Sequence, residues 1–305
     1  MKVPRTFLEF QEMFPDEEAC WAHLRRVRWP HGFICPRCGG RGSHRIRARR
    51  LDQCRRCRYQ ASLTAGTVFH KTRVPLRIWF LGVFFLARHK KGISALQFQR
   101  DTGLGSYQTA WTILHKLRSS LHARPEPRLT GLVEVDETYL GPRRVRGPRG
   151  RGAKGKTAIV VAVEQLQHSA GAARLAVVDD ITWPTLGGFI RGAIDDCEAT
   201  VRTDGYRGYV PLASAGVTHE RVVQGTAQRS AEILPWAHTV FSNLKTWIRG
   251  TFHGVSLKHL QRYLEEFNYR FDRRWKEAEL FQSVLHRAVG GEPLPYVRLT
   301  AEVIG

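Results

Sequence analysis

The chain has no apolar run long enough to cross a lipid bilayer. The apolar segment Trp79–Ala87 covers nine residues, whereas a membrane-spanning helix needs about 18 or more. A secretory signal is also missing, because Met1–Arg5 leads into a mixed polar segment instead of an apolar one. We therefore expect a cytoplasmic protein without a membrane partner.

Acidic residues are scarce relative to basic ones. The 305 residues include 27 Asp and Glu against 48 Lys and Arg, which gives a formal net charge of +21 at pH 7. This excess favours a polyanionic partner, because neutralising phosphate groups releases counterions and drives association. The alternative is a basic surface that is merely solvated or of the ribosomal type. Nucleic acid is the class of partner that we expect.

Cysteine is also sparse, and its spacing is informative. Four of the six cysteines form two Cys-x-x-Cys pairs that fifteen residues separate, namely Cys35, Cys38, Cys54 and Cys57. This spacing predicts a structural zinc site, in which two turns bring four thiolates around one Zn²⁺. Two disulfides are the alternative, and a cytoplasmic setting argues against them. The other two cysteines, Cys20 and Cys197, are expected to be buried, inert thiols.

The segment around the four cysteines is rich in arginine. It contains Arg37, Arg41, Arg45, Arg47, Arg49, Arg50, Arg55, Arg56 and Arg58. A closed four-cysteine zinc site is structural, so its role is to hold a surface in shape. We expect this arginine-rich surface to bind DNA.

A helix-turn-helix pattern follows the ribbon. Helices are predicted over 75–87, 92–100 and 106–118, with a glycine-containing turn at 102–105 and Ser106 as an N-cap. We expect a core of Ile93, Leu96, Ala110, Ile113, Leu114 and Leu117. The polar face, with Tyr107, Gln108 and Thr112, would lie in the major groove. An ordinary helical hairpin is the alternative.

The rest of the chain alternates strands and helices. Strands are predicted over 131–141, 157–164, 173–178, 200–203 and 219–223, and helices over 183–194, 234–249 and 256–275. This order is that of an α/β, RNase H-like mixed sheet flanked by helices. The first two strands are joined by a basic loop that is expected to be disordered or to face phosphate, with Arg143, Arg144, Arg146, Arg149, Arg151, Lys154 and Lys156.

Two aspartates each end a predicted strand. Asp136 follows Leu132–Val135, and Asp204 follows Thr200–Thr203. Side chains alternate between the faces of a strand, so an acid at such a place is either exposed or held at the edge of a sheet. Two acids from separate strands can bind divalent metal, and a pair of metals can drive phosphodiester chemistry. In so basic a chain, this pattern indicates an enzyme that acts on nucleic acid.

Three stretches resemble a known family. They are Val133–Gly141, Thr203–Tyr206, and Val240–Lys245 leading into Gly250–Phe271. Together with the zinc ribbon, they resemble the bacterial insertion-sequence transposases of the ISXO-like group, which have a zinc ribbon ahead of a DDE-type catalytic domain. The resemblance covers nearly the whole chain. It implies an RNase H-like fold in which Asp136 and Asp204 are ligands of two Mg²⁺ or Mn²⁺ ions.

The resemblance implies a third metal ligand that differs from the usual one. Such enzymes usually have a glutamate on a C-terminal helix, and the match to that pattern places His238 there, 34 residues after Asp204. Lys245, seven residues further on, would be a cation near the metal site that holds a phosphate. Asn243 is the second candidate for the third ligand, and Glu265 or Glu266 the next.

The function that the resemblance implies is DNA transposition. Such an enzyme binds double-stranded DNA at the terminal inverted repeats of its element, cleaves there and joins the ends to target DNA. It would act at the nucleoid as a homodimer or higher oligomer in a synaptic complex. One alternative is a non-catalytic DNA-binding regulator, which leaves the acidic strand ends unexplained. Another is an RNase H-like nuclease with a different role.

The expected domain boundaries follow the predicted elements. They are an N-terminal helix and zinc ribbon at 1–70, a helix-turn-helix-like domain at 71–124, a linker at 125–130, the catalytic domain at 131–280 and a C-terminal tail at 281–305.

Overall fold

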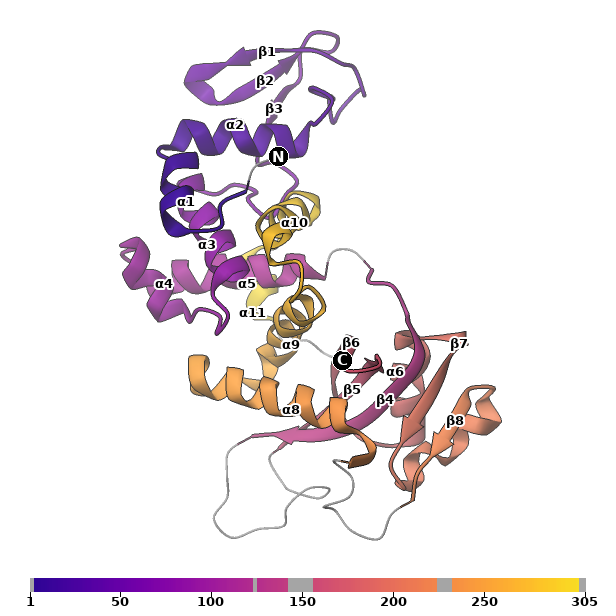
Figure 1. Cartoon of the computed structure of the whole chain (residues 1–305). Coiled ribbons are helices and arrows are strands. Elements are labelled where there is room, and N and C mark those ends of the chain that lie inside the picture. The colour runs from indigo at the N-terminus through magenta and orange to yellow at the C-terminus, as the bar shows by residue number, and fades with distance from the viewer. Residues whose placement is uncertain (1–2, 123–124, 142–155, 224–231, 302–305) are drawn as a thin grey trace. The chain divides into compact units, whose positions relative to one another are not determined.

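The computed structural model describes residues 3–122, 125–141, 156–223 and 232–301 (Figure 1). The chain forms two compact units, the first from 1–124 with 276–305 and the second from 125–275. Of the basic loop expected at 143–156, only Lys156 lies within the described residues. No helix in the described ranges is both long enough and apolar enough to cross a membrane.

The first unit combines a zinc ribbon with a group of helices. The ribbon is a three-stranded antiparallel sheet in the order β1-β2-β3, made of β1 (Ser43–Ile46), β2 (Leu51–Cys54) and β3 (Gln60–Ser62), with the 3-10 turn η1 (Arg47–Arg49) between the first two strands. The helices are α1 (Phe7–Met13), α2 (Glu17–Arg28), α3 (Leu76–Arg88), α4 (Ala95–Thr102), α5 (Tyr107–Leu121), α10 (Glu277–Gly290) and α11 (Tyr296–Thr300).

The C-terminal segment differs from the expected tail. Helix α10 packs against α3 and α5 in the first unit. Its Phe281 is 1% exposed, and its ring centroid lies 5.7 Å from that of Phe14. The guanidinium of buried Arg287 donates to the carbonyl of Leu121. The chain therefore returns to complete the core of the first unit, and the second unit ends at Trp275 instead of residue 280.

The predicted helix-turn-helix corresponds to α4 and α5. The hydroxyl of Ser106 caps α5 by accepting from the amide of Thr109, and Gly103 ends α4 in the left-handed region with φ of 67°. Five of the six expected core residues are buried: Ile93, Ala110, Ile113, Leu114 and Leu117. The sixth prediction was wrong, because Leu96 is 47% exposed while Ala95 and Phe98 on the same helix face inward. At the start of α5, Tyr107 and Gln108 are exposed and Thr112 is half-buried.

The second unit is a five-stranded mixed sheet with helices on both faces. Its strands are β4 (Leu129–Leu140), β5 (Thr157–Gln165), β6 (Ala170–Val178), β7 (Ile194–Thr203) and β8 (Thr218–Arg221), in the spatial order β6-β5-β4-β7-β8. The first three are antiparallel neighbours, whereas β7 and β8 add in parallel. The remaining elements are α6 (Trp183–Ala193), η2 (Arg207–Ala215), α8 (Pro235–Trp247), η3 (Ile248–Phe252) and α9 (Leu257–Asp272). This is the RNase H-like arrangement.

The two faces of the sheet are covered by different helices. In β5, Ile159, Val161 and Val163 pack against residues of α8 and α9. The alternate residues, such as Val160 and Ala162, pack with residues of α6 and η2. Paired residues of neighbouring strands lie on the same face, and side chains alternate along each strand. The pairing of β4 with β5 therefore assigns each residue of β4 to one of the two faces.

Candidate functional site

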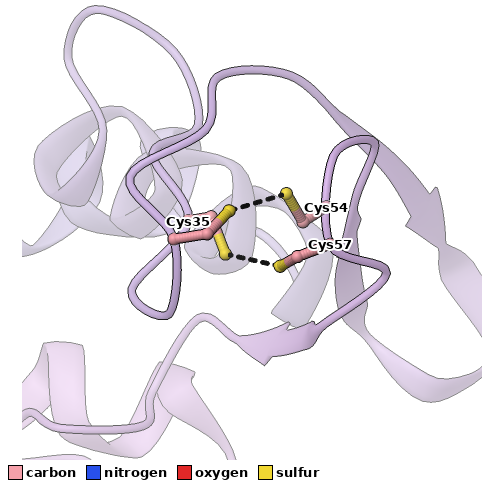
Figure 2. Close-up of side chains that lie close together, drawn as sticks. Cys35, Cys54 and Cys57 are labelled. Carbon is pink, nitrogen blue, oxygen red and sulfur yellow. Dashed lines mark hydrogen bonds between the residues drawn. The ribbon is translucent and has the colours of Figure 1, made fainter.

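The four predicted zinc ligands come together in the first unit. The sulfur of Cys35 lies 3.6 Å from that of Cys57, and the sulfur of Cys38 lies 3.7 Å from that of Cys54 (Figure 2). All four sulfur atoms lie within 4.8 Å of one another. Four thiolates at about 2.3 Å from a tetrahedral Zn²⁺ are about 3.8 Å apart. The arrangement therefore fits one zinc ion, and none of the four thiols is in a disulfide.

Each Cys-x-x-Cys pair forms the same backbone turn. The amide of Gly39 donates to the carbonyl of Cys35 at 2.9 Å, and the amide of Arg58 donates to that of Cys54 at 3.1 Å. Both donors have left-handed backbones, with φ of 67° at Gly39 and 60° at Arg58. Backbone amides, first that of Cys57, lower the pKa of the Cys54 thiol to about 7, which favours the thiolate that binds metal.

The two cysteines outside the ribbon differ from each other. Cys20 is buried, as expected, and burial raises the pKa of its thiol to about 12. Cys197 is exposed on β7, so the expectation that it is buried was wrong.

The expectation that Asp136 ends its strand was wrong, because β4 continues to Leu140, whereas Asp204 directly follows β7 as expected. The parallel register of β4 and β7 pairs Glu134 with Arg202, an offset of 68 positions (202 minus 134). The same offset joins Asp136 to Asp204 (204 minus 136), which directly follows the last residue of β7. Adjacent strands lie about 4.8 Å apart, so the register brings both carboxylates to one edge of the sheet.

The orientation of each aspartate is set by a nearby backbone amide. Oδ1 of Asp136 accepts from the amide of Glu137 at 2.8 Å, and Oδ1 of Asp204 accepts from the amide of Tyr206 at 2.9 Å. Asp136 is 9% exposed.

Tyr209 lies on the other face of the sheet from Asp136. Burial, followed by the charges of Glu137, Asp136 and Asp204, raises the pKa of its hydroxyl. Glu137 points to the opposite face of the sheet from Asp136, where it accepts from the hydroxyl of Tyr209 at 2.8 Å.

Helix α8 places His238 beside the first aspartate. Nε2 of His238 lies 3.5 Å from Oδ2 of Asp136. Two turns further along α8, Nζ of Lys245 donates to the hydroxyl of Thr138 at 2.6 Å. The Phe241 ring lies between them, 5.8 Å from the Lys245 Nζ. Burial, and then the charge of Lys245, lowers the pKa of His238, which favours the neutral imidazole that can bind metal.

The other candidates for the third ligand lie elsewhere. Asn243 is exposed on α8. Glu265 and Glu266 belong to α9, which packs against the edge strand β6, two strands away from β4. Glu266 is buried and lies 3.5 Å from the guanidinium of Arg270. Of the candidates for a third ligand, the structure brings only His238 next to Asp136.

The predicted ligand set is only partly gathered. Among the described residues, the four cysteines are the only group of three or more Cys, His, Asp or Glu side chains whose ligand atoms all lie within 4.8 Å. Asp204 therefore does not complete such a group with Asp136 and His238. The roles of these residues, and of Lys245, stay predictions.

Glu134 has a structural role that was not predicted from the sequence. Its side chain is fully buried on the same face of β4 as Asp136. Oε2 accepts from the amides of Trp236 and Ala237, both at 2.9 Å. Burial raises the pKa of this carboxyl. Since α8 has no side-chain cap of its own, Glu134 holds the beginning of the helix that contains His238. Only its place two residues before Asp136 hinted at this role.

Comparison with known proteins gives a consistent result. The ISXO2-like transposase domain matches residues 128–272, and the transposase zinc-ribbon domain matches residues 15–60. A relative from Halobacterium salinarum, described as an uncharacterized protein in transposable element ISH50, is 30% identical over 278 residues. The aligned region covers 84% of this chain and 92% of the relative. The first match spans the sheet from β4 and ends with α9, so it includes both aspartates and His238.

We expect the purified protein to contain about one Zn²⁺ per chain. Cys54→Ser should lower the zinc content and destabilise the ribbon, because structural zinc contributes directly to folding. Metal analysis by mass spectrometry and thermal unfolding would measure both effects. Cys197→Ser is the matched control, since this exposed thiol is not part of the site. A native-like ribbon without bound zinc would contradict the assignment.

Glu134→Ala should destabilise the second unit by about 2–3 kcal/mol, because two backbone amides of α8 lose their acceptor. Glu134→Gln keeps one acceptor oxygen and should cost less. Urea unfolding would measure the free energies. Glu198→Ala, at an exposed glutamate of β7, is the control and should change the free energy of unfolding by no more than about 0.5 kcal/mol. Equal effects of the two alanine variants would rule out the capping role.

Proposed function

The chain belongs to the family of ISXO2-like transposases, and on this premise we propose that it cleaves and joins DNA at the ends of an insertion sequence. The observation that best supports the proposal is the shared register offset of 68 positions. It brings Asp136 and Asp204 to one sheet edge, and α8 adds His238 at 3.5 Å from Asp136. We propose these three side chains as the metal ligands.

The donor types suit a divalent cation. Two carboxylates are typical ligands of Mg²⁺ and Mn²⁺, and an imidazole favours Mn²⁺ over Mg²⁺. The 3.5 Å between His238 Nε2 and Asp136 Oδ2 is compatible with two ligands of one ion at about 2 Å each. When bound, two such ions would supply activation of the attacking oxygen and stabilisation of the leaving oxygen in an in-line displacement.

The protein's own residues position the substrate. Lys245 is held by Thr138 on the same face of β4 as Asp136, so its positive charge would lie beside a DNA phosphate near the reacting bond. Burial lowers the pKa of this ammonium. We propose that Lys245 orients the phosphate rather than supplying overall affinity.

DNA binding is proposed for the first unit. The exposed side chains of Tyr107 and Gln108 at the start of α5 would contact base edges, as in other helix-turn-helix proteins. The arginines of the ribbon would contact phosphates, which position the protein without reading sequence. Since two ends must be held together, we propose that the active species is a homodimer or larger assembly, and that it acts on DNA in the cytoplasm.

Asp136→Asn and Asp204→Asn should each abolish cleavage and strand transfer, because a carboxamide is a far weaker metal ligand than a carboxylate. The measurement is a strand-transfer assay with DNA from the inverted repeats that flank the coding region, in Mg²⁺ or Mn²⁺. Binding to this DNA should survive, since phosphate contacts do not need the catalytic metal.

Glu198→Gln, which removes an exposed carboxylate from β7, is the control and should keep activity. Near-normal strand transfer by either aspartate variant would overturn its assignment as a catalytic metal ligand. DNA binding without any cleavage or transfer by the unmodified chain would instead favour the non-catalytic regulator. Cleavage without joining would favour a nuclease of another type.

His238→Glu should retain or raise Mg²⁺-dependent strand transfer, whereas His238→Ala should lower it, because a carboxylate is a better ligand for Mg²⁺ than an imidazole. The ratio of Mg²⁺ to Mn²⁺ activity measures the change of ligand directly. Asn243→Ala is the matched control on the same helix. Loss of activity in Asn243→Ala together with normal activity in His238→Ala would transfer the role to Asn243.

A further inference from the structure

The first unit contains a groove of about 560 Å³ beside the zinc ribbon. Four segments form its walls: α2, the η1 turn, the end of β3 and the stretch that leads into α3. The lining residues from these segments that matter here are Glu17, Trp21, Arg49, Arg50, Lys71 and Arg73.

The groove is strongly basic. Arg49, Arg50, Lys71 and Arg73 are all exposed, and Glu17 is the only acid among the lining residues. The carboxylate of Glu17 is occupied by the protein itself. It accepts from the amide of Leu76 at 2.8 Å and from that of Arg77 at 3.0 Å, which caps α3. The same carboxylate lies 3.4 Å from the guanidinium of Arg50. One of the four cations is therefore paired with Glu17, and the groove keeps a formal excess of three positive charges.

The backbone at two of these cations is in a conformation that disfavours side chains. Arg50 has φ of 50° and Lys71 has φ of 53°. Within the described residues they are two of only four non-glycine residues with positive φ. The left-handed region costs about 1–2 kcal/mol for residues other than glycine, asparagine and aspartate, and such strain tends to persist at functional sites. Glycine would be less strained at both positions. The sequence therefore has a cation at each of two places where the backbone conformation favours glycine.

Two further interactions fix the shape of the groove. The guanidinium of Arg28 donates to the carbonyls of Leu63 and Ala65, which holds the end of β3. The guanidinium of Arg50 lies over the Trp21 ring, 5.1 Å from its centroid. Trp21 is therefore covered by a cation and does not offer its face for stacking with a base.

We propose that this groove binds the phosphodiester backbone of duplex DNA, as a contact separate from base reading by α5. The proposal rests on the proposed function, because it specifies how the transposase holds its DNA. Four cations from two segments 21 residues apart (71 minus 50) suit a run of phosphates, and the guanidinium over Trp21 argues against stacking of a splayed base on that face. The contact is thus expected to be independent of DNA sequence.

The test compares the full-length chain with the double variant Lys71→Gly/Arg73→Gln. Affinity is measured against salt concentration for two duplexes, one from the element's end and one unrelated. The variant should weaken binding to both by the same factor, on the order of 5- to 20-fold. The slope of log affinity against log salt should fall by about 0.9 for each lost phosphate contact, and thus by about 2 in total. The midpoint of thermal unfolding should stay the same or rise, because glycine suits the left-handed backbone at position 71.

Arg26→Gln is the matched control. This exposed arginine lies on α2, on the opposite side of the helix from Glu17. Replacing it should change the slope of log affinity against log salt little. An unchanged salt slope in the double variant would overturn the proposed DNA contact in the groove while leaving the proposed function intact. The same conclusion would follow from weakening confined to one duplex, from a preference for single strands, or from a lower unfolding midpoint. If the unmodified chain binds neither duplex, the proposed function itself fails.

Discussion

The second unit depends on the parallel register between β4 and β7. The offset of 68 positions gives Asp136 and Asp204 matching positions along the two strands, and the register also determines which face each residue of β4 meets. A slip of one residue would exchange the faces. Asp136 would then face the apolar layer under α6, and Glu137 would face α8. Val133 and Val135, both buried on the face of β4 that packs with α6 and η2, stabilise one register because a slip would move them out of their apolar layer.

The same strand also positions the helix that completes the site. A buried carboxylate is destabilising unless it is well hydrogen-bonded. Glu134 meets this need only in part: Oε2 accepts from two amides at the start of α8, whereas buried Oε1 has no hydrogen-bond partner among the described residues. A negative charge at a helix N-terminus is favourable as well. Three alternate residues of β4 therefore contact α8: Glu134 at its first turn, Asp136 at His238 and Thr138 at Lys245. Strand and helix align along their lengths, so Asp136, His238 and Lys245 are held by regular elements, whereas Asp204 follows the end of β7.

The parts of this architecture that the sequence predicts are those with a local signal. Cysteine spacing predicted the ribbon, and apolar periodicity predicted the strands and helices of the second unit. The features that were missed depend on partners far away in the chain. The capping of α8 by Glu134 joins residues about a hundred positions apart. Likewise, the amphipathic pattern of α10 does not reveal that its Phe281 packs against Phe14. Leu96 was wrongly predicted to be buried because a short helix exposes some apolar residues. Apolar periodicity alone does not determine which of several adjacent apolar residues faces the core.

The two units use charge in opposite ways. In the second unit the important charges are buried or half-buried, paired with backbone amides or hydroxyls, and their positions are tightly determined. In the first unit the cations around the ribbon and its groove are largely exposed, and Arg50, Arg58 and Lys71 have left-handed backbones where glycine would be more stable. Exposed cations suit a polyanion whose phosphates repeat, because affinity then depends on the number of charges more than on exact geometry. Chemistry at a single phosphate has the opposite requirement, since small displacements of a catalytic group lower the rate strongly. On the proposed function, the buried charges of the second unit would position one bond, and the exposed cations around the ribbon would hold a long polymer.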